Sequence, residues 1–183
     1  RSPRFESDLR AQLLGKGILP YDIATLGSYK KYTPDAYALG YYLVGQSRQR
    51  YGFRLWNEAV DRVARRPSLA VPFNSGIRKV TGAWKRDLYR QSLLTLDSAW
   101  KVQRENTPTT VLRTVTRRDP AHHTSYHRPQ GLNDTTLVAE RTSLNEVSRF
   151  VLLDLRTGNE RTLCIPGAYH PGSLSAGGEY LAW

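Results

Sequence analysis

The sequence predicts an α+β protein, in which an all-α helical subdomain is followed by antiparallel β-strands. Hydrophobic residues recur at helical spacing through residues 1–106, whereas residues 107–183 hold short strand-like runs separated by turns that contain Gly. Charge divides at the same point, since residues 1–106 carry 19 Lys and Arg against 9 Asp and Glu, and residues 107–183 carry 8 against 7. We therefore predict a helical subdomain over 1–106 and a β unit over 107–183.

The composition narrows the class of protein. With 39% hydrophobic residues, the chain of 183 is too apolar for a disordered tail. Its one cysteine, Cys164, excludes an internal disulfide framework and a cysteine zinc cage, and we expect it to be a packed thiol. No apolar run reaches the roughly 18 residues of a membrane span, and no signal-peptide pattern is present. Because the chain holds no Met and begins with Arg1, we expect it to be cut from a longer protein.

Five helices are predicted in the first subdomain, each from a stripe of hydrophobic residues and an end signal. The first covers residues 6–14 and closes at Gly15 and Gly17. A short helix runs through residues 77–80 to a C-cap at Gly82. The longest covers about 84–103, and its stripe consists of Tyr89, Leu93, Leu96 and Trp100.

The other two predicted helices follow one another closely. Thr33, Pro34 and Asp35 indicate a helix start, because a hydroxyl caps the first turn and Pro suits the first helical position. Gly52 ends this helix, and the next covers residues 53–66 and stops before Pro67. We expect the aromatic residues to belong to the core and not to a nucleic-acid stacking platform. The two stripes are Tyr37, Tyr41, Val44 and Tyr51, and then Leu55, Ala59, Val63 and Arg66.

The β unit contains a repeat with a period of 43 residues. Tyr126-His127 reappears as Tyr169-His170, and residues 137–139 align with residues 180–182. A period of roughly 40–45 residues with strand chemistry indicates the four-stranded blades of a β-propeller. The strands of the first blade are predicted at 126–130, 136–141, 149–155 and 160–164, and the next blade runs from 169 to 183.

The predicted propeller is incomplete. The repeat accounts for about one and a half blades, whereas a closed propeller has about 4–8. The hydrophobic faces of an unfinished blade need a cover. We therefore expect Phe150, Leu152 and Leu181 to face water or a partner, and we expect the open β edge to be covered by the rest of the parent protein or by another protein.

No catalytic, cofactor-binding or metal-ligating residue is predicted in this chain. His123 and His127 have the spacing of a helical zinc motif, but the residue after His123 is Thr124 and not the required Glu. Pro120 and Pro129 also indicate an extended segment, in which the two imidazoles lie too far apart for one metal ion. A nucleophile turn of the type Gly-x-Ser-x-Gly and a glycine-rich phosphate loop are both missing from the sequence.

Two basic clusters lie in the helical subdomain. We interpret both as solvated helix faces, and we do not expect nucleic acid as a partner, because no recognition-helix turn or RNA-binding strand signature accompanies them. The clusters are Arg62, Arg65 and Arg66, and Lys85, Arg86 and Arg90.

Several segments of the chain resemble parts of a known class of protein. The run GSYKKYTPDAYALGY at 27–41, followed by Tyr51-Gly52, is similar to the helical region of secreted bacterial gluzincin-like (peptidase MA-like) metallopeptidases. In that class the region lies after the zinc site and is followed by a TolB-like or WD40-like β-propeller. The runs DLRTG at 154–158 and LSAGG at 174–178 resemble its blade turns. The catalytic signature, His-Glu-x-x-His with a downstream Glu, has no counterpart here, so the resemblance implies zinc only in the parent protein.

We therefore expect a non-catalytic fragment of an envelope or secreted metallopeptidase–propeller protein, with a helical scaffold and protein-interaction blades. The cell-envelope or secreted location comes from the resemblance alone. The alternative is a self-sufficient binding module for an acidic protein, a glycan or nucleic acid. A module of that kind resists proteolysis as one unit, whereas two separate units are trimmed rapidly after Asn106.

Overall fold

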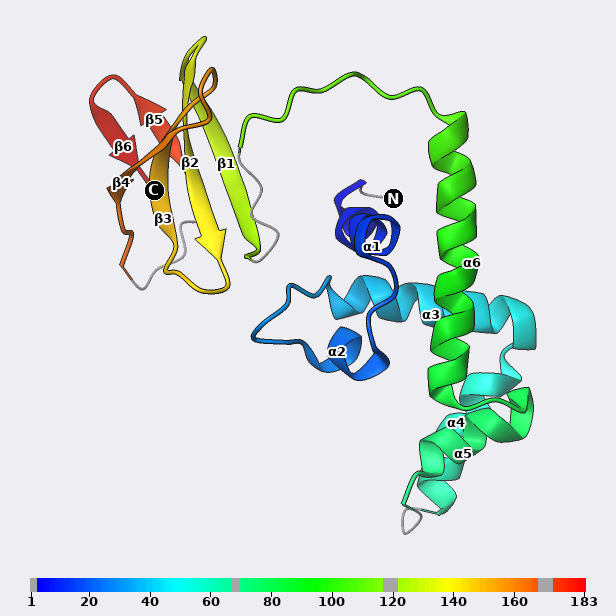
Figure 1. The fold of residues 1–183 in the computed structure, drawn as a ribbon. Coiled ribbons are helices and arrows are strands. Elements are labelled where there is room, and N and C mark those ends of the chain that lie inside the picture. The colour runs from blue at the N-terminus through cyan, green and yellow to red at the C-terminus, as the bar shows by residue number, and fades with distance from the viewer. Residues whose placement is uncertain (1–2, 67–69, 117–121, 168–172) are drawn as a thin grey trace. The chain divides into compact units, whose positions relative to one another are not determined.

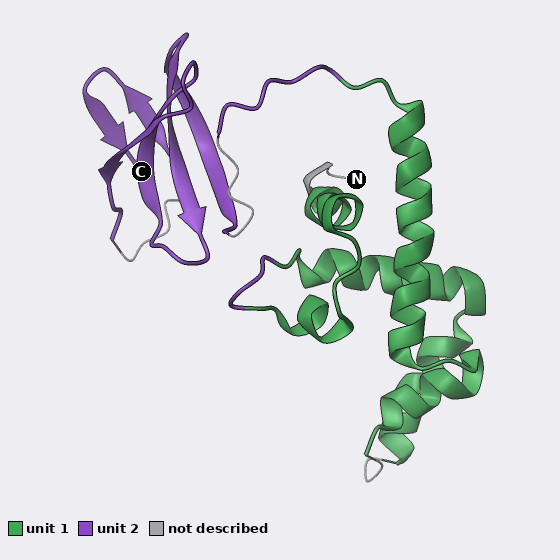
Figure 2. Cartoon of the chain, in the orientation of Figure 1, with its two compact units in different colours: residues 1–28, 33–109 green, residues 29–32, 110–183 purple. Residues whose placement is uncertain are grey.

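The structure is a computed structural model that describes residues 3–66, 70–116, 122–167 and 173–183. It is α+β, as the sequence predicts, with helices first and antiparallel strands after them (Figure 1). The chain forms two compact units (Figure 2). Residues 1–28 and 33–109 make the helical unit, and residues 29–32 and 110–183 make the β unit. None of the described helices is long and apolar enough to cross a membrane.

The described part of the helical unit contains six helices, one more than predicted. The additional helix is α2, which has only six residues and therefore shows no clear hydrophobic stripe in the sequence. The helices are α1 Pro3–Lys16, α2 Tyr21–Leu26, α3 Ala36–Tyr51, α4 Arg54–Arg65, α5 Pro72–Thr81 and α6 Lys85–Asn106.

Glycines end the helices where the sequence predicts. The Gly52 amide donates to the Arg48 carbonyl after α3, and the Gly82 amide donates to the Arg78 carbonyl after α5. Gly82 has φ +73° and ψ −9°, the left-handed conformation that favours glycine at this position. The predicted N-cap of α3, the Thr33 hydroxyl, is wrong. The N-cap is Asp35, whose side chain accepts a hydrogen bond from the Tyr37 amide at 2.9 Å.

The core of the helical unit consists of two clusters. The larger one joins α1, α2 and α3 to α6, and the predicted stripe of α6 lies entirely within it. The smaller one joins α4 and α5 to the start of α6, and Gly76 of α5 lies directly against the Ala59 backbone of α4. The buried residues of the larger cluster are Leu9, Leu13, Ala24, Leu39, Tyr42, Tyr89, Leu93, Leu96 and Trp100, and those of the smaller are Leu55, Ala59, Ile77 and Leu88.

The predicted core stripe of α3 is wrong for three of its four residues, and only Tyr51, at the end of the helix, packs against the smaller cluster. Tyr37 is 83% exposed, and Tyr41 and Val44 are about half exposed. The face that packs in the core is the opposite one, which carries Leu39 and Tyr42. The reason is that α3 is apolar on both faces, so its spacing indicates two stripes and does not say which of them is buried.

The prediction for α4 is confirmed in its first half only. Leu55 and Ala59 are fully buried in the smaller cluster. Val63 and Arg66 are exposed, and the residue of the last turn of α4 that contacts α5 is instead Arg62, which donates to the Ser75 hydroxyl at 3.2 Å.

The β unit contains a four-stranded antiparallel sheet in the order β1-β2-β3-β4, and a separate hairpin of β5 and β6. Consecutive strands are neighbours throughout, so the sheet is a simple meander. The four predicted strands are confirmed, and β1 starts two residues earlier and ends three residues later than expected. The strands are β1 Thr124–Asn133, β2 Thr136–Ser143, β3 Arg149–Asp154, β4 Glu160–Cys164, β5 Ser175–Gly177 and β6 Tyr180–Ala182.

The β5–β6 hairpin packs on one face of the sheet. Phe150 is fully buried there beside Val138 and Leu174, and its ring centroid lies 5.2 Å from that of Trp183. Leu152 and Leu181 pack against the same cluster. The expectation that Phe150, Leu152 and Leu181 face water or a partner is therefore wrong, because the chain's own hairpin covers them.

The two hairpins follow the sequence repeat closely. The turn between β1 and β2 begins at Asp134 and the turn between β5 and β6 begins at Gly178, so they lie 44 residues apart. Val138 and Leu181, which the repeat aligns, belong to one hydrophobic cluster. The aligned pair Tyr169-His170 lies outside the described residues.

Candidate functional site

The histidines that the sequence brings together in one segment take separate partners in the structure. His123 Nε2 lies 2.9 Å from the Ser125 hydroxyl, and His127 Nε2 lies 3.1 Å from the Thr142 hydroxyl on the neighbouring strand. Among the residues that the structure describes, no three His, Cys, Asp or Glu side chains gather as metal ligands would. His127 thus lies within β1 of the sheet, and His123 lies directly before that strand.

Cys164 lies at the end of β4, opposite Phe150 on β3. Its side chain is partly buried and packs against the cluster of Val138, Phe150 and Leu174. A thiol that packs against aliphatic and aromatic groups behaves as a small hydrophobic residue. The structure thus gives Cys164 a packing role.

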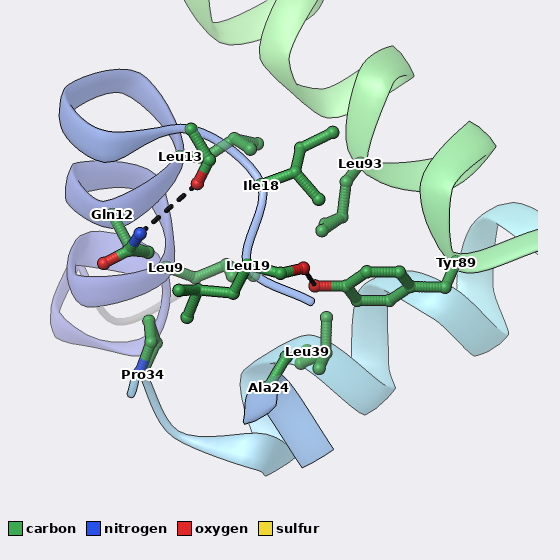
Figure 3. A pocket seen from close by; sticks show the side chains of 11 residues that line it. Leu9, Gln12, Leu13, Ile18, Leu19, Ala24, Pro34, Leu39, Tyr89 and Leu93 are labelled. Carbon is green, nitrogen blue, oxygen red and sulfur yellow. Dashed lines mark hydrogen bonds between the residues drawn. The ribbon is translucent and has the colours of Figure 1, made fainter. Parts of the chain in front are cut away.

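An apolar pocket opens among α1, the α1–α2 connection, α2, α3 and α6 (Figure 3). It encloses about 300 Å³, including its open mouth. Its walls belong mostly to the larger core cluster, so it is a gap in the packing of that core. The lining residues are Leu9, Gln12, Leu13, Gly17, Ile18, Leu19, Ala24, Pro34, Leu39, Tyr89 and Leu93.

Two polar side chains of this pocket donate hydrogen bonds to backbone carbonyls. The Tyr89 hydroxyl donates to the Leu19 carbonyl at 2.8 Å, and the Gln12 amide donates to the Gly17 carbonyl at 3.3 Å (Figure 3). Burial raises the pKa of Tyr89 to about 12, with a smaller contribution from Tyr21, so the phenol stays protonated and keeps donating at neutral pH. The pocket therefore offers apolar surface without a charge or a nucleophile.

A polar groove lies between α3 and α6. It is open to solvent and measures about 690 Å³. Arg50 donates to Gln91 across it at 3.4 Å, and Ser92 is buried in its wall. The buried Ser47 hydroxyl has no hydrogen-bond partner within the described ranges. The lining residues are Gln46, Ser47, Gln49, Arg50, Tyr51, Leu88, Gln91, Ser92 and Thr95.

Each of the two basic clusters of the sequence has one arginine that is paired with a carboxylate in the structure. Arg65 pairs with Asp61 at 3.5 Å, and Arg86 pairs with Asp22 at 2.6 Å. The start of α6 is also occupied by its own chain, because the Asp87 carboxylate accepts from the Trp84 amide at 3.0 Å. These contacts neutralise part of the positive charge and leave no phosphate-binding helix end there.

A network of charged side chains links the strands of the β unit. Arg141 contacts the carboxylates of Glu146 and Glu160, and Arg149 contacts Glu146 at 2.9 Å. The hydrogen bond from Arg141 lowers the pKa of Glu146, and burial together with Glu160 raises the pKa of Tyr126 to about 12. Every charge in this network has a partner of opposite sign, which is the arrangement of a structural network.

Glu140 is buried in β2 and is paired with Arg128 at a distance of 2.5 Å. Arg128 stands at an irregularity of β1, where the register shifts between His127 and Gln130, and has φ +52°. A buried carboxylate that loses its cation strongly destabilises the fold. The bulge of β1 therefore stabilises the β unit, because it places the Arg128 guanidinium within ion-pair distance of the Glu140 carboxylate.

An exposed aromatic face on α3 is a feature that the sequence did not predict. The Arg48 guanidinium lies 3.5 Å from the ring centroid of Phe53, which is 65% exposed. Together with Tyr37, Tyr41 and Val44 these residues form a surface that combines rings and a cation. Sequence reasoning missed it because it assigned that stripe to the core.

Comparison with protein-family models, with curated proteins and with solved structures found no match for this chain.

Proposed function

We propose that this chain is a non-catalytic part of an envelope or secreted metallopeptidase–propeller protein, in which the helical unit is a scaffold and the β unit provides protein-interaction blades. The resemblance of residues 27–41 and of the turns at 154–158 and 174–178 suggests this class. In this proposal zinc belongs to the parent protein and not to this chain.

The observation that carries the proposal is the packing of the β5–β6 hairpin on the β1–β4 sheet. A four-stranded meander, with the first hairpin of a repeat against its face, is the arrangement that successive blades of a propeller require. The Leu181 side chain of one repeat meets the Phe150 cluster of the other, so the contact between repeats is hydrophobic. The outer edge of β4 has no neighbouring strand among the described residues, and the rest of the parent protein or a protein partner covers it.

The test of the non-catalytic assignment is a combined metal and peptidase assay. The chain is loaded with zinc, dialysed, analysed for bound metal and incubated with unfolded casein. We expect no stoichiometric zinc and no cleavage. One zinc ion per chain, together with casein cleavage that a chelator abolishes, would overturn the proposal.

A self-sufficient binding module is the second candidate, and the exposed aromatic face of α3 favours it. Limited proteolysis separates the two possibilities. A module of one piece resists cleavage over its whole length, whereas the scaffold-and-blade proposal predicts rapid cleavage after Asn106, in the segment that links the two units.

A further inference from the structure

The outward face of α3 has the composition of a protein-binding surface. We propose that this face, formed by Tyr37, Tyr41, Val44 and Arg48 with Phe53 beside it, binds an acidic amphipathic helix of a partner protein. We call these five residues the α3 outer face. The proposal goes beyond the scaffold role and does not depend on how the β unit is assigned.

The geometry of the α3 outer face suits a helix. Its four α3 positions follow one another at intervals of four, three and four residues, so they form one line along α3 of about 16 Å. Tyr37 is 83% exposed, and Phe53 extends the same surface at the start of α4. A line of this spacing and length matches the row of side chains that a partner helix of three turns presents.

Burial of the α3 outer face by a partner would be energetically favourable. Leu39 and Tyr42 already bury the opposite face in the larger core cluster. A helix that is apolar all round is normally buried all round, because each exposed aromatic side chain forgoes the free energy of burial. Tyr, Phe and Arg are also the residue types that supply most of the binding energy at protein interfaces.

The charge of the surface selects an acidic partner. The Arg48 guanidinium lies over Phe53 and gives this face its positive charge. Arg48 forms no ion pair with a carboxylate in the part of the chain that the structure describes. Residues 1–106 carry 19 basic against 9 acidic residues, so a second copy of this chain is repelled and a helix rich in Glu is attracted.

The rings are arranged for a protein and not for stacked bases. The Tyr41 ring meets Phe5 and Tyr42 edge to face, at centroid distances of 5.4 and 5.3 Å. One face of the Phe53 ring is occupied by the Arg48 guanidinium. Base stacking needs free ring faces in succession, whereas the side chains of a helix pack against ring edges and against Val44 equally well.

The experiment uses the full chain and two synthetic peptides of about 20 residues, long enough to form an amphipathic helix. Both carry Leu and Phe on one face, and the other face carries Glu in one peptide and Lys in the second. Fluorescence anisotropy measures binding, and amide chemical shifts locate it. We expect saturable binding of the Glu peptide with shifts at residues 37–48, and binding of the Lys peptide that is at least about tenfold weaker.

Two pairs of variants assign the binding to the α3 outer face. We expect Val44→Ser to lower the affinity of the chain for the Glu peptide. We expect Arg48→Glu to make the Lys peptide bind more tightly than the Glu peptide. The matched controls, Val102→Ser and Arg104→Glu on the exposed last turns of α6, leave both affinities unchanged. All four positions are exposed, and circular dichroism confirms that the variants are folded.

Four outcomes overturn the proposal. Absence of binding, or equal binding of the two peptides, removes the acidic helix as the partner. If sedimentation shows twice the mass of one chain, and Val44→Ser restores the single mass, then a second copy of the chain binds the α3 outer face. If single-stranded RNA binds through the same residues more tightly than the Glu peptide does, then nucleic acid is the ligand of the α3 outer face.

Discussion

The Tyr89 hydroxyl shows how one residue holds two segments of the helical unit together. It stands on α6 and donates to the Leu19 carbonyl in the connection between α1 and α2, where no other donor of the described structure reaches that oxygen. The tyrosine is almost fully buried, so water does not replace the bond.

Replacing Tyr89 with Phe should destabilise the helical unit. The substitution keeps the ring and leaves the Leu19 carbonyl without its donor, which costs about 1–2 kcal/mol of unfolding free energy. Urea unfolding measures the change. Tyr37→Phe is the matched control, because that hydroxyl is exposed, and it should alter stability by less than about 0.5 kcal/mol. Equal effects of the two variants would contradict the role of Tyr89.

Asp154 holds the turn between β3 and β4 through its carboxylate. The oxygen Oδ1 accepts from the amides of Thr157 and Arg156 at 3.0 and 2.8 Å, and these bonds lower the pKa of Asp154. Because the folded-state pKa lies below the unfolded one, the stabilisation is complete above the ordinary pKa of about 3.9 and is lost as the pH falls through the lowered value.

A carboxyl-carbon NMR titration tests this pH dependence. We expect the Asp154 resonance to titrate below the ordinary pKa of an aspartate. The neighbouring turn amides of Arg156 and Thr157 should shift with the same midpoint, since they donate to the titrating oxygen. A midpoint at or above the ordinary aspartate value would show that the turn does not depend on this charge.

At the scale of elements, the contact between α4 and α5 depends on the absence of a side chain at Gly76. A Cβ atom at this position would lie 2.6 Å from the Ala59 Cα and 2.9 Å from the Glu58 carbonyl oxygen. Both are backbone atoms, so one helix must move as a whole.

Gly76→Ala should therefore destabilise the α4–α5 pair by about 1–3 kcal/mol, the usual cost of overpacking. The matched control is Gly45→Ala in α3, where an added Cβ meets no atom within 4 Å. In a helix interior this second change should raise stability by up to about 1 kcal/mol. Thermal unfolding of both variants measures the difference, and a neutral Gly76→Ala variant would refute the close packing.

The elements also show how far sequence reasoning reaches. All four residues of the α6 stripe are buried as predicted, because the opposite face of that helix is polar and only one face can enter the core. On α3 the same reasoning chose the wrong face. Tyr37 and Leu39 are both apolar, and only the positions of α1 and α6 decide which of them is covered.

The hydrophobic cover of the sheet could not be read from the sequence either. The period of the repeat predicts the β5–β6 hairpin but does not say that three-residue strands suffice to bury Phe150. The aromatic and cationic surface around Arg48 escaped prediction for a similar reason, since it follows from the misassigned stripe of α3.

At the scale of the whole molecule, the chain consists of two units that each have their own core. Residues 107–115 have no regular secondary structure, and Val111 and Leu112 are almost fully exposed. A segment of this kind is the preferred place for a protease to cut. We expect limited digestion with a protease of broad specificity to cut first between Asn106 and Leu112, ahead of Arg113, which donates to the Leu155 carbonyl of the β unit. Both products should keep the secondary structure of their units by circular dichroism. Resistance of the segment would instead favour a single binding module.

The central claim is that consecutive repeats stack on each other in the β unit, and the contact between Phe150 and Trp183 tests it most directly. In a double-mutant cycle with Phe150→Leu and Trp183→Leu, urea unfolding of the β unit gives the coupling between the two side chains. We expect a coupling of about 0.5–1.5 kcal/mol, as for other aromatic pairs in contact. The exposed Tyr180 on the same hairpin is the control, and its cycle with Phe150 should be additive. Additivity of Phe150 and Trp183 would contradict the stacking of repeats, and with it the proposed blades.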